Sequence, residues 1–275
     1  MLPVLIKTYA RDAEWLYWLL RSADRFAGGF GPWYVVTEPE SMDAIRRTIL
    51  RGARSRSFGV ALRVFDSHDA LPEGRVVLEG VGNRGYIHQQ YCKLHGDLIV
   101  GGDHLQIDSD CFLVRETTPT DWGAPPYWFK TPFASLVGSQ ALAWRDVTNA
   151  ILGFTPAACH HVALGQLVPV EHEYMRRHPF YMRAEGLRGL RAHLERQHSK
   201  SIAELFRGLD HVSEYNLYGA WCERFAPELH RWIDTSSVPP DQWPPVVALQ
   251  GWSYAGHRAG IPPDTLARYH ALLGE

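Results

Sequence analysis

Apolar and polar residues in the first 115 positions alternate in the way that is typical of a layered α/β protein. Short apolar runs predict strands at 2–9, 33–38, 58–66, 74–80 and 105–108. Apolar residues that recur every three or four positions predict helices at 12–26, 39–53 and 85–100. Since strands joined by helical crossovers lie parallel, the pattern predicts a mostly parallel sheet with helices on its faces.

The clearest amphipathic pattern is at 12–26, where the apolar residues fall on one helical face: Trp15, Leu16, Leu19, Leu20 and Ala23. We expect this face to pack against the sheet. The next predicted helix opens with Pro39, a residue favoured in the first helical turn.

The chain beyond residue 115 has a less regular pattern. Helices are predicted at 139–152, 185–198, 201–209, 213–225 and 263–274, and a strand at 160–172. The segment 122–133 is rich in proline and aromatic residues and carries no clear period. No linker or internal repeat divides the chain, which predicts one domain over 1–275 whose later part forms the second wall of a cleft.

Composition excludes several classes of protein. Apolar residues make up 45% of the chain and charged residues 21%, values ordinary for a globular protein. The net charge of −2 gives no overall attraction to nucleic acid or to an anionic membrane.

The cysteines point to a reducing compartment. They are far apart and form no Cys-x-x-Cys pair, which argues against a structural zinc site and against a disulfide framework; they are Cys92, Cys111, Cys159 and Cys222. Residues 1–12 hold too few apolar residues for a signal peptide, and no apolar run is long enough to span a membrane. We therefore expect a cytoplasmic protein.

Four polar residues fall at the carboxyl ends of predicted strands: Thr8, Glu38, Asp66 and Asp108. Such ends meet at one edge of a parallel sheet, where ligands bind. The last of them belongs to an Asp-Ser-Asp sequence, Asp108 to Asp110, that has apolar residues on both sides. Buried carboxylates need a partner, and a hard cation is a common one. The alternative is a plain turn with two solvated aspartates.

Four segments carry a family resemblance: 4–26 (VLIKTYARDAEWLYWLLRSADRF), 85–94 (GYIHQQYCKL), 105–115 (LQIDSDCFLVR) and 213–221 (SEYNLYGAW). Together they resemble the DUF6492 group, a bacterial and phage family of GT-A-type glycosyltransferases. The resemblance implies a GT-A-like α/β fold with helical additions in its C-terminal half. It also implies a nucleotide-sugar-binding half at 1–115 and an acceptor-side half at 116–275.

The activity implied by the resemblance is a transferase that uses a nucleotide-sugar donor and a divalent cation, Mn²⁺ or Mg²⁺. A cation at the Asp-x-Asp site would stabilise the departing nucleoside diphosphate as a Lewis acid. Asp110 would be the more direct ligand, and Asp108 would meet the ribose or a metal-bound water. His257 would be a third ligand, since imidazole suits Mn²⁺; its alternative is a surface-loop histidine.

Glu214 is the candidate catalytic residue. Ser213 can cap a helix there, which puts Glu214 in the first turn, where the helix dipole favours the ionised carboxylate. In related folds such a residue faces the acceptor. It would be the general base of an inverting enzyme, or would orient the acceptor of a retaining one. The alternative is a glutamate that only stabilises the helix.

Donor-binding residues are expected in two places. The glycine-rich stretch 80–85 allows backbone N–H groups to face phosphate. Arg84 within it and Lys93 after it supply cations for a diphosphate, and Gln90 can hydrogen-bond a base or ribose. At the end of the first strand, the resemblance places the nucleobase beside Thr8, Tyr9 and Arg11.

The expected acceptor is a hydroxyl of a surface polysaccharide or another glycoconjugate. One alternative is a hydroxymethylated base of phage DNA, for which the arginines between Arg46 and Arg56 could supply a basic groove. Others are a nucleotidyltransferase, an aspartate-dependent phosphatase, or a nucleotide-sugar-binding protein without turnover. The residues leave the donor nucleotide, the sugar, the stereochemical outcome and the oligomeric state open.

Overall fold

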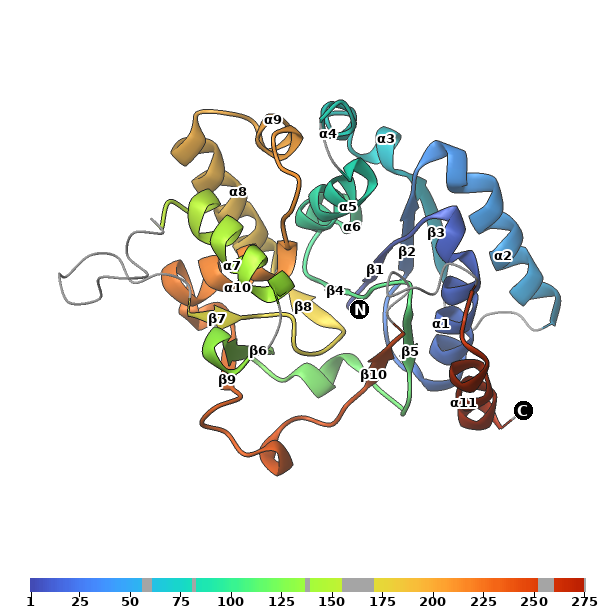
Figure 1. The fold of residues 1–275 in the computed structure, drawn as a ribbon. Coiled ribbons are helices and arrows are strands. Elements are labelled where there is room, and N and C mark those ends of the chain that lie inside the picture. Colours follow the sequence, from blue (N-terminus) through green and yellow to red (C-terminus); the bar gives the residue numbers. More distant parts are fainter. Residues whose placement is uncertain (56–60, 81–82, 137–138, 155–170, 252–259, 275) are drawn as a thin grey trace.

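The computed structural model describes residues 1–55, 61–80, 83–136, 139–154, 171–251 and 260–274 (Figure 1). Its central sheet has five strands in the order β3-β2-β1-β4-β8, which are Leu62–Asp66, Trp33–Thr37, Val4–Lys7, His104–Gln106 and Phe180–Met182. The first four are parallel, and β8 is antiparallel to β4. This topology confirms the predicted mostly parallel α/β sheet flanked by helices.

The two faces of the sheet bury alternate residues of each strand, as the pleat requires. Val4 and Ile6 of β1 join the core beneath α1 (Ala13–Phe26), while Leu5 points to the face covered by α6 (Gly96–Val100). All five apolar residues predicted for the face of α1 are buried. Next to α1 lies α2 (Met42–Ser55), which follows a single 3-10 turn that begins at Pro39.

Helices dominate the second half of the chain, which confirms the predicted helical additions (Figure 1). They are α7 (Ser139–Ile151), α8 (Ala184–His198), α9 (Ile202–Arg207), α10 (Glu214–Phe225) and α11 (Pro263–Leu273). Together with α5 (Arg84–Leu94), helices α8, α9 and α10 enclose the largest core. No helix among the described residues is long and apolar enough to cross a membrane.

Two smaller sheets complete the architecture. One has the order β7-β6-β9, formed by His172–Glu173, Tyr127–Pro132 and Arg231–Asp234. In the other, β10 (Ala248–Gln250) runs antiparallel to β5 (Cys111–Leu113), so a late segment of the sequence pairs with the strand that follows the Asp-Ser-Asp turn.

The strand predicted at 74–80 is wrong, because Gly74–Leu78 forms the helix α4. Its β-branched valines suit a strand, but α4 packs between α5 and α9, away from the edge strand β3, and tertiary packing overrides the local preference. Most of the strand predicted at 160–172 lies outside the described residues. The strand β6 was not predicted, because Pro126 and Pro132 at its two ends concealed it.

The single helix predicted at 85–100 is two helices, α5 and α6, that meet at His95. The imidazole Nδ1–H of His95 donates to the carbonyl of Tyr91 at 2.8 Å, and the backbone N–H of His95 bonds to Cys92 instead. A side chain therefore takes the carbonyl that would have continued the α-helical ladder, and the chain changes direction.

Candidate functional site

The carboxyl ends of β1, β2, β3 and β4 share one edge of the sheet, so the four predicted strand-end residues follow strands that end together. Two of these residues have internal partners. Glu38 forms a buried ion pair with Lys7 at 2.6 Å and contacts His88 at 3.1 Å. Asp66 accepts from the backbone N–H of His68 and so caps the short helix α3 (Ser67–Ala70).

Asp108 lies at the centre of a buried ionic cluster. Its Oδ1 is 2.5 Å from the ammonium of Lys93, and the same nitrogen is 2.7 Å from Oε1 of Glu214. The side chains of Lys93 and Glu214 are 2% and 1% exposed, whereas that of Asp108 is 16% exposed. One lysine therefore joins two of the predicted site carboxylates, and of these three side chains Asp108 is the one that reaches solvent.

Three further side chains surround the Asp108 carboxylate. Tyr215 donates its hydroxyl to Oδ1 at 3.2 Å, and Gln250 donates to Oδ2 at 3.4 Å. Nε2 of His178 is 3.6 Å from Oδ2. These residues come from α10, from the end of β10 and from the loop before β8, so distant parts of the chain converge on one aspartate.

Burial and charge move the pKa values of this cluster in opposite directions. Burial favours a neutral Asp108, but Lys93 and His178 outweigh it and hold the pKa of the Asp108 carboxyl below its usual value. Burial and the nearby Asp108 charge raise the pKa of Glu214, although Lys93 opposes them. Burial lowers the pKa of His178 to about 4, so its imidazole is neutral at pH 7.

At Glu214, burial opposes the ionised form that the helix terminus favours, and it raises the pKa of the carboxyl. Ser213 does cap α10, since its Oγ accepts from the N–H of Asn216 at 3.3 Å, and Glu214 lies in the first turn as predicted. The carboxyl is fully buried, however, and the cost of removing its charge from water exceeds the benefit of the helix dipole.

One face of α5 holds the segment that leads into α10. Tyr86 donates to the carbonyl of Val212, Gln90 accepts from the N–H of Glu214 at 3.3 Å, and Lys93 pairs with the Glu214 carboxylate. These three residues are spaced four and three positions apart, so they share one helical face. Gln90, expected at the base or ribose, is buried and has this internal partner.

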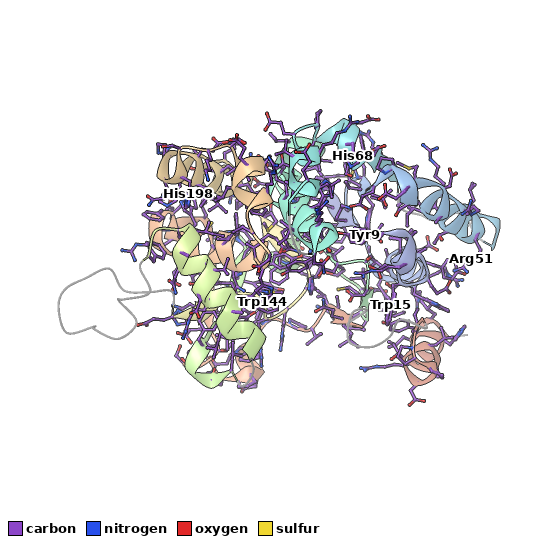
Figure 2. The ribbon with its side chains drawn as sticks, turned by 45° about the horizontal axis from the view of Figure 1, so that its top comes forward. Tyr9, Trp15, Arg51, His68, Trp144 and His198 are labelled. Carbon is purple, nitrogen blue, oxygen red and sulfur yellow. The ribbon has the colours of Figure 1, made fainter. Side chains whose placement is uncertain are left out.

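An aromatic cluster adjoins the same segment. The rings of Tyr86 and Trp144 both stack with His211, at centroid separations of 6.0 and 5.7 Å. The indole N–H of Trp144 donates to the hydroxyl of Tyr86 at 3.2 Å. This cluster connects α7 to α5. Figure 2 shows Trp144 on α7.

Asp110 directly precedes β5, at the end of the turn, and is buried; its backbone carbonyl accepts from the N–H of Gly251 at 2.6 Å. His257, the third predicted metal ligand, lies outside the described residues. Within the described ranges, no group of three or more His, Cys, Asp or Glu side chains is arranged to hold a metal ion. Asp110 has the carboxylate chemistry that Mn²⁺ and Mg²⁺ prefer, whereas Asp108 already faces an ammonium.

The predicted nucleobase residues lie at the end of β1. Thr8 is buried, and its carbonyl accepts from the hydroxyl of Thr37 at 3.0 Å. Tyr9 (Figure 2) donates to the carbonyl of Gly85 in the first turn of α5, and the ammonium of Lys7 is 4.3 Å from the Tyr9 ring centroid. The side chain of Arg11 is 72% exposed. Of these, Arg11 has a charge that faces solvent.

In the glycine-rich stretch, one glycine serves close packing of the chain. A Cβ at Gly80 would overlap the backbone of Arg207, so this glycine permits close packing against α9. Gly82 lies outside the described residues. Arg84 is exposed, and its guanidinium donates to the carbonyl of Leu78 at 2.9 Å.

Sequence reasoning missed His178, Tyr215 and Gln250. Tyr215 stands within the SEYNLYGAW segment, beside Glu214, and that position was the available signal. His178 and Gln250 lie in irregular segments whose sequence gives no sign that they meet Asp108.

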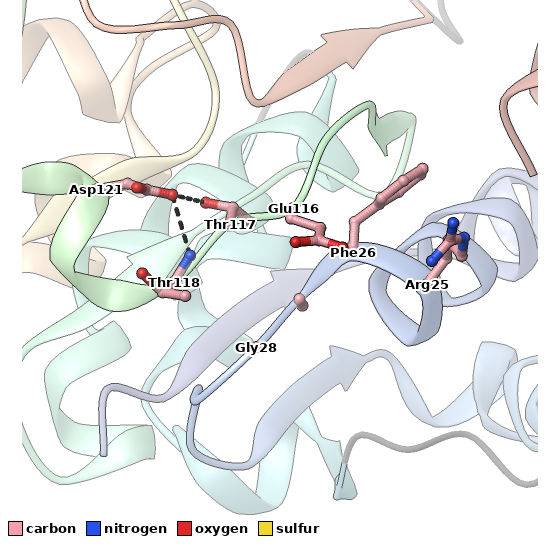
Figure 3. A pocket seen from close by; sticks show the side chains of 8 residues that line it. Arg25, Phe26, Gly28, Glu116, Thr117, Thr118 and Asp121 are labelled. Carbon is pink, nitrogen blue, oxygen red and sulfur yellow. Dashed lines mark hydrogen bonds between the residues drawn. The ribbon is translucent and has the colours of Figure 1, made fainter.

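A separate hollow of about 320 Å³ lies where the end of α1 meets the segment after β5 (Figure 3). Arg25, Glu116 and Thr118 are among its lining residues, and Asp121 accepts from Thr117 and Thr118 at its edge. None of the predicted site residues lines this hollow.

Compared with known proteins, the chain matches no family model and no curated protein. Among solved structures it is similar to mouse xyloside xylosyltransferase 1 in its apo form, with 12% identity, a TM-score of 0.49 and 85% of each chain covered. It is also similar to the apo structure of the bifunctional glycosyltransferase WbbM, with 14% identity and a TM-score of 0.33. That match covers 56% of this chain and 25% of the other.

Proposed function

We propose that this protein is a glycosyltransferase that moves a sugar from a nucleotide-sugar donor to an acceptor hydroxyl of a glycan or glycoconjugate. The proposal includes membership of the DUF6492 group and a location in the cytoplasm. The observation that carries it is the cluster of Asp108, Lys93 and Glu214 at the carboxyl edge of a mostly parallel sheet. This edge is where α/β sheets bind nucleotides.

The donor would lie over the turn from Asp108 to Asp110. Asp108 is the partly exposed member of the cluster, and its lowered pKa keeps it ionised at neutral pH. A divalent cation held by Asp110 would supply the positive charge that a departing diphosphate needs. At the end of β1, Arg11 has an exposed guanidinium for the nucleotide.

Glu214 would act on the acceptor side. Its raised pKa brings the carboxylate closer to the working pH, which makes it a stronger base toward an acceptor hydroxyl. This role belongs to an inverting reaction. In a retaining reaction Glu214 would orient the acceptor instead.

One observation favours a second candidate, a nucleotide-sugar-binding protein without turnover. Glu214 is 1% exposed, so an acceptor hydroxyl has no access to it in this conformation. Catalysis requires the residues that cover Glu214 to move aside when substrates bind, whereas donor binding alone does not.

A thermal-shift screen tests the proposal. UDP-, GDP-, CMP- and TDP-sugars are each added with and without Mn²⁺, and a donor that binds the folded state raises Tm by mass action. A shift that needs one nucleotide together with the metal supports the donor site. Release of free nucleotide on adding a mixture of acceptor glycans then separates a transferase from a binding protein. The absence of any shift would refute both.

A further inference from the structure

Lys93 touches both the donor side and the acceptor side of the proposed site. Its ammonium lies between the turn after β4 and the first turn of α10, with Asp108 at 2.5 Å and Glu214 at 2.7 Å. It is 2% exposed, and Asp108 and Glu214 together raise its pKa well above the usual value against the effect of burial. A permanent, buried positive charge therefore joins two segments that are distant in sequence.

The described neighbours of the ammonium already occupy the directions in which it could reach a ligand. An ammonium has three N–H donors. The nitrogen lies within ion-pair distance of both carboxylates, and the ring centroid of Tyr215 is 4.9 Å from it, where a cation–π contact is favourable. The aliphatic part of Lys93 is buried within α5 and its neighbours. This geometry differs from that of a lysine that reaches for a phosphate.

We propose that Lys93 is a positioning residue, which holds Asp108 and Glu214 at a fixed separation, and that it does not bind the donor diphosphate. This inference rests on the proposed function and assigns one residue of that site. Two carboxylates this close would repel each other without the shared cation, and the turn after β4 would separate from α10. Reacting groups that move by about 1 Å lose much of their rate advantage.

The same contact disfavours a cation on one oxygen of Asp108. A divalent ion on Oδ1 would lie beside the ammonium, and the two positive charges would repel strongly in a buried site. This agrees with the proposed role of Asp110 as the residue that would hold the cation.

The first test is a double-mutant cycle that measures Tm, so it does not depend on enzymatic activity. Lys93→Met leaves two buried carboxylates without a cation, and we expect Tm to fall on the order of 10 °C. In the Lys93→Met background, Glu214→Gln should recover about half of that loss, because one uncompensated charge disappears. Additive effects of the two substitutions would overturn the proposal.

The matched control is Arg191→Met. Arg191 forms a buried, two-bond ion pair with Asp97 at 2.6 and 2.9 Å and donates to the carbonyl of Leu94; among the described residues, no ion pair or hydrogen bond joins it to Asp108 or Glu214. Its loss should lower Tm comparably, but Glu214→Gln should give no recovery in that background. If Glu214→Gln recovers Tm equally in both backgrounds, it stabilises the protein in general, and the proposal is overturned.

The second test measures nucleotide affinity and turnover separately. UDP, GDP, CDP and TDP are titrated in the presence of Mn²⁺ into the wild type and Lys93→Met. A positioning role predicts that Kd changes by less than about threefold while kcat falls at least about 100-fold. A tenfold or larger rise in Kd would show that Lys93 binds the diphosphate and would overturn the proposal.

Failure of the proposed function and failure of the inference about Lys93 give different results. If the wild type binds no nucleoside diphosphate, the proposed function fails, and the double-mutant cycle still decides whether Lys93 ties the two carboxylates. If Lys93→Met does not fold, Lys93→Met/Glu214→Gln is compared with Glu214→Gln in the nucleotide titration. That pair differs only at position 93, so the same limits on Kd apply.

Discussion

The hydroxyl of Tyr215 donates to Oδ1 of Asp108 at 3.2 Å and so links the first turn of α10 to the turn that follows β4. The tyrosine ring is itself fixed, because it stacks on Phe180 of β8 with a centroid separation of 4.0 Å. Residue 215 therefore presents its hydroxyl to Asp108 from a rigid support, next to the candidate base.

Tyr215→Phe should weaken the site while the fold persists. It removes one hydrogen bond to an ionised carboxylate, which is worth about 1.5 kcal/mol, so we expect kcat/KM to fall about tenfold. Steady-state kinetics with varied donor measures this loss. Tyr218→Phe is the control, since the Tyr218 hydroxyl bonds to Arg183 and His230 instead. An equal loss of kcat/KM in the control would contradict the specific role of Tyr215.

Asp110→Asn should weaken Mn²⁺ binding and abolish the metal-stimulated activity. The amide is of similar size but carries no charge, so we expect at least about 100-fold weaker Mn²⁺ binding and no metal-stimulated turnover. Isothermal titration with Mn²⁺ and turnover after chelation with EDTA measure the two effects. Asp69→Asn changes an exposed carboxylate on α3 and should leave both unchanged. Metal-stimulated turnover that survives in Asp110→Asn would contradict the proposed function.

Glu173 makes stability depend on pH. Burial raises the pKa of this carboxyl from 4.5 to about 7. A raised folded-state pKa contributes stability that is complete below pH 4.5 and is lost as the pH rises through 7. We expect the wild type to lose about 3 kcal/mol of unfolding free energy relative to Glu173→Gln between about pH 4.5 and pH 8.

Urea unfolding of both proteins at the two pH values measures this difference. The glutamine side chain of Glu173→Gln keeps an oxygen that can accept from the N–H of Met175, as the native carboxylate does at 2.7 Å. Glu171→Gln, at an exposed neighbouring position, should show the wild-type pH dependence. A parallel pH dependence in wild type and Glu173→Gln would refute the prediction.

Gly219 in the middle of α10 should not tolerate alanine, even though alanine is the better helix former. A Cβ at Gly219 would overlap the ring of Tyr174, and we expect Gly219→Ala to cost about 1–3 kcal/mol. At Gly208 the nearest atom to an added Cβ is 3.6 Å away, so Gly208→Ala should change stability by less than about 0.5 kcal/mol. Chemical unfolding of the two variants compares the positions. A neutral Gly219→Ala would show that Tyr174 moves freely.

Periodicity predicted the first layer of the fold well. The strands near residues 4, 33, 62 and 104 and the buried face of α1 follow directly from apolar runs and helical spacing. Local patterns failed where packing decides. The valines of α4 have strand preference, yet the helix is stabilised by its neighbours α5 and α9.

The candidate site was predicted as a set of residues and not as a set of contacts. Lys93 and Asp108 were both expected at the donor, but their ion pair depends on how α5 crosses the end of β4. His178 comes from the loop before β8 and Gln250 from the end of β10, and only the folded chain brings them to Asp108. Sequence spacing does not reveal contacts between residues that lie so far apart in the chain.

The pairing of β5 with β10 determines when the site forms during synthesis. Residues 111–113 leave the ribosome well before their partners at 248–250. Until those partners emerge, Phe112 has only the cover of Trp15 and Trp18 on α1 and lacks Tyr269 of α11, on which it stacks in the folded protein. A nascent chain that has completed α10 therefore has its largest core but an unfinished donor turn. We expect such a chain to recruit a chaperone at β5.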